Sequence, residues 1–193
     1  MSDKITNIVL VGVGGQGILL AAEILSETFM LAGYDVKKSE IHGMSQRGGS
    51  VVSHVRYGKE VFSPMVPEGE GDILFGFELM ETYRYLTLLK PGGSVVVNDL
   101  CIAPPAVLIG QAQYPADLAE KIKSKVTDCL LVDGQNLAVE AGNARTANTV
   151  LLGAVSKRLD IAENFWIESI ERMVPKKAVA VNLKAFELGR SLA

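Results

Sequence analysis

The chain opens on an apolar strand pattern that runs directly into a cluster of glycines. Residues 5–12 read ITNIVLVG, a β-branched run of the kind that forms buried strands. The segment GVGGQG occupies residues 12–17, and residues 16–31 are rich in helix formers with apolar residues at helical spacing. A strand, a glycine turn and a helix in this order predict the first unit of a Rossmann-like fold.

Further strands and helices are predicted along the chain. Strands are expected at residues 33–40, 71–77, 94–98 and 129–134, with two short strands within 49–64 that meet at Tyr57-Gly58. Helices are expected at 78–89, 115–126, 136–140, 143–159, 163–172 and 177–192. Strands that alternate with helices through the first 135 residues predict an α/β fold: a mostly parallel sheet sandwiched by helices, with a helical C-terminal region.

Length and composition favour one domain over residues 1–193. A chain of this length buries about 70% of its unfolded surface around a single core. Its net charge of -3 and the absence of a long basic run give no electrostatic footprint for nucleic acid or for an anionic membrane. The N-terminal apolar run is too short to span a membrane and has no basic segment before it, so we expect a cytoplasmic protein.

Cysteine and histidine are scarce. Cys101 and Cys129 are the only cysteines, whereas an Fe4S4 cluster takes four cysteine ligands. His42 and His54 are the only histidines, which leaves little material for a histidine-rich metal site or a Ser-His-Asp triad. We therefore predict neither a metal ligand nor a catalytic residue on this chain.

The glycine turn matches the G-x-G-x-x-G spacing of dinucleotide-binding folds. A helix that starts there offers unpaired N–H groups to an anion, and Glu40 at the end of the second predicted strand suits a ribose hydroxyl. Gly15-Gln16 adds a third consecutive small or polar element to the turn, and Glu40 leads into a polar loop; both features fit NAD binding poorly. The alternative is that the glycines only allow close packing of helix and sheet. The motif residues are Gly12, Gly14, Gly15, Gln16 and Gly17.

A second glycine-rich segment, SEIHGMSQRGGS, spans residues 39–50. Its glycines permit a tight loop with exposed backbone N–H groups, and the Arg47 guanidinium beside them suits a phosphate or carboxylate. We expect this loop beside the glycine turn, at the carboxyl edge of the sheet. The alternative is a connection in which His42 and Met44 merely fill a gap. The candidate residues are Gly43, Met44, Ser45, Gln46, Arg47, Gly48 and Gly49.

A third motif, GNARTAN, spans residues 142–148. Asn143 follows a glycine and has the chemistry of a helix N-cap. Asn148 falls inside a predicted helix, where a buried amide needs partners such as the backbone of the glycine turn. Packing alone is the alternative for Asn148.

In sequence order, six segments resemble the gamma-type domain of the 2-oxoacid:ferredoxin oxidoreductases. They read VGVGGQG, SEIHGMSQRGGSVVSHVRYG, GDILFGFELMETYRYL, LKPGGSVVVN, EAGNARTANTVLLGA and VPKKAVAVNLKAFELG, and together they cover nearly the whole chain. Within the family, the VPEG segment, the PP and YP pairs in residues 104–115 and the VNLKAFELG ending are most similar to the small subunits of the indolepyruvate-specific enzymes. Gly12, Gly14, Gly15, Gln16, Gly17, Gly43, Met44, Ser45, Gln46, Arg47, Gly49, Asn143, Arg145 and Asn148 match family motifs.

The resemblance implies a subunit of a larger enzyme. Such enzymes decarboxylate a 2-oxoacid on thiamine diphosphate, pass electrons through Fe4S4 clusters to ferredoxin, and release an acyl-CoA. This chain lacks the Gly-Asp-Gly and Asn-Asn signature for thiamine as well as the cysteines for clusters. The resemblance therefore implies a large thiamine and iron-sulfur partner subunit, with thiamine diphosphate, Fe4S4 clusters and CoA in the complex, and no activity for this chain alone.

Three functions remain open from the sequence. The first is the small subunit of an indolepyruvate:ferredoxin oxidoreductase, and the second is the gamma subunit of a 2-oxoglutarate, pyruvate or ketoisovalerate enzyme. The third is a free-standing nucleotide-binding Rossmann protein. In the first two, the glycine-rich loops would face the large subunit and Arg47 would meet CoA phosphates or an acidic patch. Apolar segments at residues 65–66, 75–80 and 165–166 are candidates for the docking surface.

Overall fold

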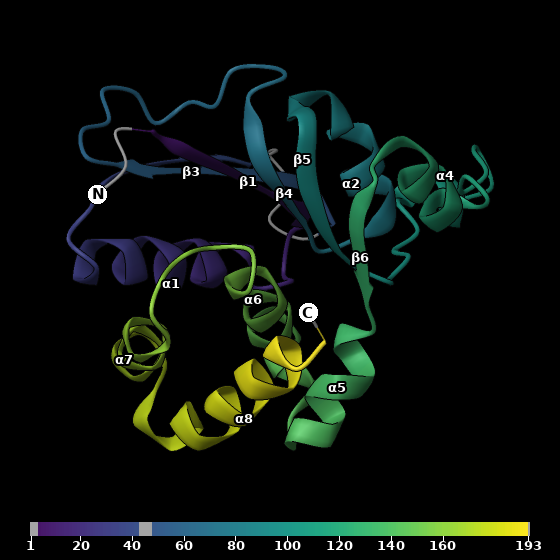
Figure 1. The fold of residues 1–193 in the computed structure, drawn as a ribbon. Helices are drawn as coiled ribbons and strands as arrows, with labels where there is room; N and C mark the ends of the chain where they lie inside the picture. The colour runs from purple at the N-terminus through teal and green to yellow at the C-terminus, as the bar shows by residue number, and fades with distance from the viewer. Residues whose placement is uncertain (1–3, 43–47, 193) are drawn as a thin grey trace.

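The computed structural model describes residues 4–42 and 48–192, which form a sheet between two layers of helices (Figure 1). The strands are β1 Thr6–Val13, β2 Asp35–His42, β3 Ser50–Gly58, β4 Gly71–Gly76, β5 Leu89–Asn98 and β6 Asp128–Val132. The helices are α1 Ile18–Leu31, α2 Leu79–Arg84, α3 Pro105–Leu108, α4 Leu118–Lys125, α5 Gly134–Ala141, α6 Ala147–Ser156, α7 Glu163–Met173 and α8 Val179–Arg190. Short 3-10 helices occur at η1 Leu86–Leu88, η2 Ala144–Thr146 and η3 Lys176–Ala178.

The described strands form one sheet in the order β2-β3-β1-β4-β5-β6. The pairs β1–β4, β4–β5 and β5–β6 are parallel, whereas β3 is antiparallel to both of its neighbours, β1 and β2. Only β3 therefore runs against the other described strands. The predicted α/β fold with a mostly parallel sheet is confirmed, and its helical C-terminal region is formed by α5 to α8.

Four predicted elements, two short strands and two helices, differ from the observed ones. The two short strands expected within residues 49–64 are wrong, because one strand ends at Gly58 and the chain continues as a loop. Pro64 and Pro67 lack the N–H group that a strand ladder needs. The helix expected at 78–89 ends at Arg84, since Leu89 already pairs with Gly71 as part of β5. The helix expected at 143–159 is divided into η2 and α6.

The sheet is buried on both faces because its strand residues alternate between two cores. Ile8 and Leu10 pack with α1, α6, α7 and α8, whereas Val9 and Val11 pack with α2 and α4. Such continuous apolar strands are typical of sheets covered on both sides. The candidate docking segments at 75–80 and 165–166 largely serve these cores, since Phe75 and Trp166 are fully buried.

The loop between β3 and β4, residues 59–70, is held against β3 by hydrogen bonds to Arg56 and His54. The Arg56 guanidinium donates to the carbonyl oxygens of Ser63 at 2.9 Å and Met65 at 3.0 Å. Val66 is buried, and its backbone N–H donates to Nδ1 of His54 at 3.3 Å. Because His54 is only 3% exposed, its neutral ring is part of the loop's attachment.

His54 makes the stability of the fold depend on pH. Burial, and then the charge of Arg56, lower the pKa of His54 below its ordinary value of 6.5. The unfolded chain therefore takes up a proton first, so this contribution is complete above about pH 6.5 and is lost as the pH falls through the lower folded pKa. We expect the thermal midpoint to fall less between pH 7.5 and 5 in His54→Asn, whose amide oxygen can still accept from Val66. Parallel curves for the two proteins would contradict this role.

Candidate functional site

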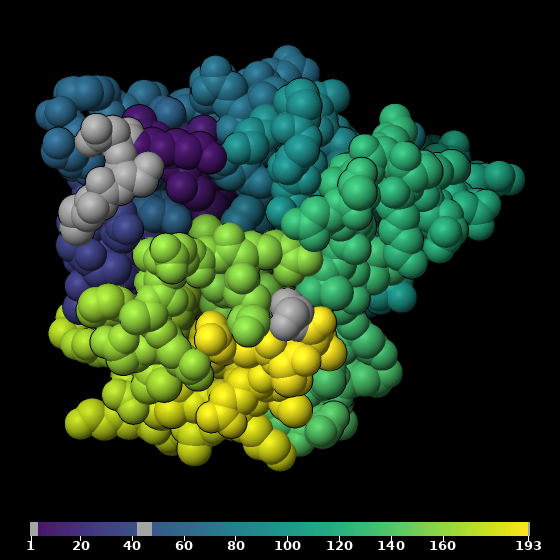
Figure 2. Space-filling view, in the orientation of Figure 1, coloured from purple at the N-terminus to yellow at the C-terminus, as the bar shows by residue number. Residues whose placement is uncertain are grey.

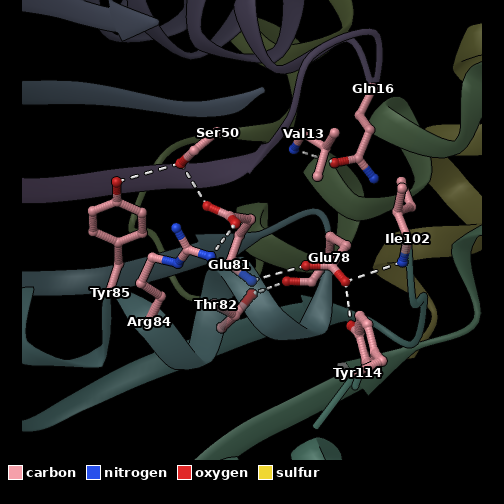
Figure 3. Close-up of polar contacts among 10 residues, drawn as sticks. All are labelled: Val13, Gln16, Ser50, Glu78, Glu81, Thr82, Arg84, Tyr85, Ile102 and Tyr114. Atoms are coloured by element: carbon pink, nitrogen blue, oxygen red, sulfur yellow. Dashed lines mark hydrogen bonds and ion pairs between the residues drawn. The ribbon is translucent and has the colours of Figure 1, made fainter. Parts of the chain in front are cut away.

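The glycine turn is tied to the end of β4 by the side chain of Gln16. Its Oε1 accepts from the backbone N–H of Val13 at 2.7 Å, and its Nε2 donates to the carbonyl oxygen of Phe77 at 2.7 Å. In the view of Figure 3, the amide of Gln16 lies between Val13 and Ile102. Gln16 thus fixes the shape of the turn instead of presenting a free polar group.

Two of the turn glycines are required by close packing. A Cβ atom on Gly12 would lie 2.6 Å from Oε1 of Gln16 and 2.7 Å from Cβ of Phe77. On Gly17, which has a positive φ of 77°, it would lie 2.7 Å from Nδ2 of Asn148. The packing alternative therefore accounts for Gly12 and Gly17. It does not account for Gly15, which has a φ of 102° and no atom within 4 Å of the added Cβ.

The third motif meets the first. The Asn148 amide donates to the carbonyl oxygen of Gly17 at 3.3 Å from a position only 6% exposed, so the turn's backbone is the partner that the sequence predicted. Asn143 caps η2, with its side chain accepting from the N–H of Arg145 at 3.0 Å. The short segment from Asn143 to Asn148 thus places Arg145 and Asn148 beside the glycine turn.

The two motifs line one cavity of about 490 Å³, the glycine-turn cavity, at the carboxyl ends of β1, β4 and β5. Its lining mixes polar and apolar side chains, and it suits a ligand with an anionic end, since the first N–H groups of α1 and the exposed Arg145 guanidinium both favour negative charge. The lining residues are Gly15, Gln16, Gly17, Leu20, Phe77, Asn98, Leu100, Ile102, Gln135, Ala144, Arg145, Ala147, Asn148 and Leu151.

Much of the second motif, Gly43, Met44, Ser45, Gln46 and Arg47, lies outside the described residues. Gly48 and Gly49 are described, and the carbonyl oxygen of Gly49 accepts from the N–H of Gly14 at 2.9 Å. The end of this segment therefore lies beside the glycine turn, as predicted. It does so because β3 pairs directly with β1, with Val13 opposite Ser50.

Glu40 does not occupy the position that a ribose contact requires. The antiparallel β3 separates β2 from β1, so Glu40 lies two strands from the glycine turn. Its carboxylate pairs with the Lys38 ammonium at 3.0 Å on the outer strand of the sheet. The ribose hypothesis for Glu40 is therefore wrong, and the likeness to a dinucleotide site is confined to the turn itself.

Two buried carboxylates on the chain that follows β4 were not identified from the sequence. Glu78 is fully buried and accepts from the N–H groups of Glu81 at 2.8 Å and Ile102 at 3.1 Å and from the Tyr114 hydroxyl (Figure 3). Glu81 is 3% exposed and accepts from the Ser50 hydroxyl at 2.5 Å. Together they connect the start of β3, the start of α2 and the chain that follows β5.

The missed carboxylates had no distinguishing pattern. An acidic residue in an amphipathic helix is ordinarily predicted to face water.

Burial, and then the hydrogen bond to Glu78, raise the pKa of Tyr114, so its hydroxyl stays protonated and keeps donating to the carboxylate. The Glu78–Tyr114 contact is therefore a stable structural link.

The described residues do not group into a metal site. Among residues 4–42 and 48–192, no three His, Cys, Asp or Glu side chains are grouped closely enough to hold a metal ion. Cys101 and Cys129 are the only cysteines in the sequence, which cannot provide four ligands for an Fe4S4 cluster. In the same part of the chain, no helix has the length and apolar character to cross a membrane.

The chain is similar in sequence to known oxidoreductase subunits. The chain is 46% identical to the indolepyruvate oxidoreductase subunit IorB of Pyrococcus horikoshii over 190 residues, covering 95% of this chain and 93% of that one. It is 30% identical to the pyruvate/ketoisovalerate oxidoreductases common subunit gamma of Thermococcus litoralis, covering 84% and 81%.

The fold is also similar to a solved structure. The crystal structure of the keto/oxoacid ferredoxin oxidoreductase gamma subunit from Geobacter sulfurreducens PCA has a TM-score of 0.73 and 26% identity, covering 97% of this chain and 98% of that one. The family model of pyruvate ferredoxin/flavodoxin oxidoreductase matches residues 7–192. The chain therefore belongs to the pyruvate ferredoxin/flavodoxin oxidoreductase family.

Proposed function

We propose that this chain, as one gamma-type domain, is the small subunit of a cytoplasmic indolepyruvate:ferredoxin oxidoreductase. In this role it supports the CoA-dependent oxidative decarboxylation of aryl 2-oxoacids, with electrons passed to ferredoxin. The 46% identity to a subunit of that name, over nearly the full length of both chains, carries the proposal. The glycine-turn cavity supports it, because five residues that match family motifs line it: Gly15, Gln16, Gly17, Arg145 and Asn148.

The two alternatives have less support. A gamma subunit of a 2-oxoglutarate, pyruvate or ketoisovalerate enzyme is the second candidate, but the identity to a pyruvate/ketoisovalerate subunit is 30% over a smaller share of the chain. A free-standing nucleotide-binding protein is the third. It lacks the acidic group that would contact a ribose, because Glu40 pairs with Lys38 away from the turn.

A division of labour follows from the residues present. A large partner subunit would hold thiamine diphosphate and the Fe4S4 clusters, which supply decarboxylation and electron transfer. This chain would contribute the polar rim around the glycine-turn cavity, where its N–H groups and Arg145 can hold an anion. CoA phosphates, or an acidic patch on the large subunit, are the anions that this rim would meet.

The anion role predicts a change in CoA affinity. In the assembled enzyme, Arg145→Ala and Arg47→Ala should each raise the KM for CoA by about tenfold, the loss of one hydrogen bond to a charged group, with kcat less affected. Arg172→Ala is the matched control, since Arg172 pairs with Glu27 and Glu168 on the helical side of the molecule. An unchanged KM for CoA and unchanged assembly in both test variants would contradict the anion-binding role.

The proposed function itself is tested by purification under anaerobic conditions. A tagged copy of the chain, expressed in its native host, should bring down a larger protein together with iron and thiamine diphosphate. A chain recovered alone, and stabilised against heat by NAD or NADP, would favour the free-standing alternative, because a ligand at 100 times its Kd adds about 2.7 kcal/mol.

A further inference from the structure

Residues 101–116, here called the arm, join β5 to α4 and contain no Asp, Glu, Lys, Arg or His. The chain's other charge-free run of similar length, residues 5–22, forms β1, the glycine turn and the start of α1, and is largely buried. The arm is different because it lies at the surface. It projects beside α4 at the right of Figure 1, and the same projection is visible in Figure 2.

The exposed side of the arm is uncharged and mostly apolar, with Gln111 and Gln113 among its exposed polar residues. Leu108 is 74% exposed and Ile109 is 66% exposed, and the arm's prolines and alanines are for the most part exposed as well. Surface segments ordinarily carry charge, whereas the centre of a protein interface is depleted of charged residues because each would have to lose its water. The composition of the arm is therefore that of a surface that another protein covers.

Glu78 holds the arm at both ends. Its carboxylate accepts from the N–H of Ile102 at 3.1 Å near the start and from the Tyr114 hydroxyl near the end. Inside the arm, α3 is closed by hydrogen bonds such as that from the N–H of Leu108 to the carbonyl oxygen of Pro104 at 3.1 Å. An arm ordered in this way loses little conformational entropy when a partner covers it.

A groove of about 430 Å³ separates the arm from α2. Met80 and Arg84 line it from α2, and Pro104 and Leu108 line it from the arm. Ile102 lines both this groove and the glycine-turn cavity, so the two adjoin at the start of the arm. A protein that fills the groove would therefore also reach the edge of the cavity.

We propose that the arm is the docking element for the large subunit, which meets it with an uncharged apolar surface and places a side chain in the groove. This inference rests on the proposed function. The large subunit is the occupant because the groove adjoins the glycine-turn cavity through Ile102, and the partner beside that cavity must bring the groups for the chemistry. The described residues of this chain offer no metal site beside it.

The test is a competition inside the assembling enzyme. The large subunit is expressed together with equal amounts of wild-type chain and a Leu108→Asp/Ile109→Asp variant, each with a different tag, and the captured ratio is measured by mass spectrometry. Two charges in the interface should reduce incorporation by about 30-fold or more. The matched control is Met30→Asp, at an exposed apolar position at the end of α1, which should be incorporated about equally.

The possible outcomes distinguish a failure of the docking proposal from a failure of the proposed function. Equal incorporation of wild type and double variant would overturn the docking role and leave the proposed function intact. Loss of a contact between two copies of this chain, with the large subunit still bound, would also overturn it in favour of a second copy. Failure of the wild-type chain to join any large subunit would instead contradict the proposed function.

Discussion

Gly189→Ala is expected to destabilise the protein by about 3 kcal/mol or more, the upper range for overpacking a core. Helices α6 and α8 cross so closely that a Cβ atom at Gly189 would lie 1.8 Å from the carbonyl oxygen of Val150. A backbone atom cannot rotate away, so the helices would have to separate. The hydrogen bond from Thr149 to Asn182, at 2.7 Å, spans the same crossing and would be lost with it.

The measurement is urea unfolding of the isolated variants. Gly153→Ala, whose Cβ would lie 2.1 Å from the carbonyl oxygen of Phe186, should show a loss of similar size. Glu187→Ala is the control in the same helix, because Glu187 is exposed and its replacement should stay within about 0.5 kcal/mol of wild type. A Gly189→Ala protein as stable as the control would mean that the helices are not this close.

Glu78→Ala is the second large loss, of about 3 kcal/mol. The carboxylate is the acceptor for two backbone N–H groups and a hydroxyl, and buried donors left without a partner cost about 1–3 kcal/mol each. Because Ile102 and Tyr114 belong to the arm, the variant should also be incorporated less into the complex.

Two conservative variants separate the charge from the hydrogen bonds. Glu78→Gln keeps one acceptor oxygen and should recover part of the stability, whereas Tyr114→Phe removes a single donor and should cost about 1 kcal/mol. Urea unfolding gives the stability, and the competition experiment gives the incorporation. Wild-type stability in Glu78→Ala would show that the carboxylate does not fasten the arm.

The elements that the sequence predicts well are those with a local cause. The β-branched run before the glycine turn, the helical spacing in α1 and the buried run at β4 each carry their own pattern. Asn148 was also predictable, since a buried amide must find a partner and the turn was the nearest candidate.

The elements that escape prediction depend on contacts between distant segments. Nothing local in Ser50–Gly58 says that this strand pairs antiparallel between β1 and β2, yet that order removes Glu40 from the glycine turn. The burial of Glu78 depends on distant segments as well, because two of its three donors come from residues 24 and 36 positions away. Docking segments at Phe75 and Trp166 were expected for the same reason, since an apolar run alone does not distinguish core from interface.

The most direct test of the central claim is turnover by the reconstituted complex. Under anaerobic conditions, the large subunit with and without this chain is assayed for CoA-dependent dye reduction with indolepyruvate, 2-oxoglutarate and pyruvate. We expect turnover only when both subunits are present, and fastest with indolepyruvate. Full activity of the large subunit alone, or a preference for pyruvate or 2-oxoglutarate, would contradict the account.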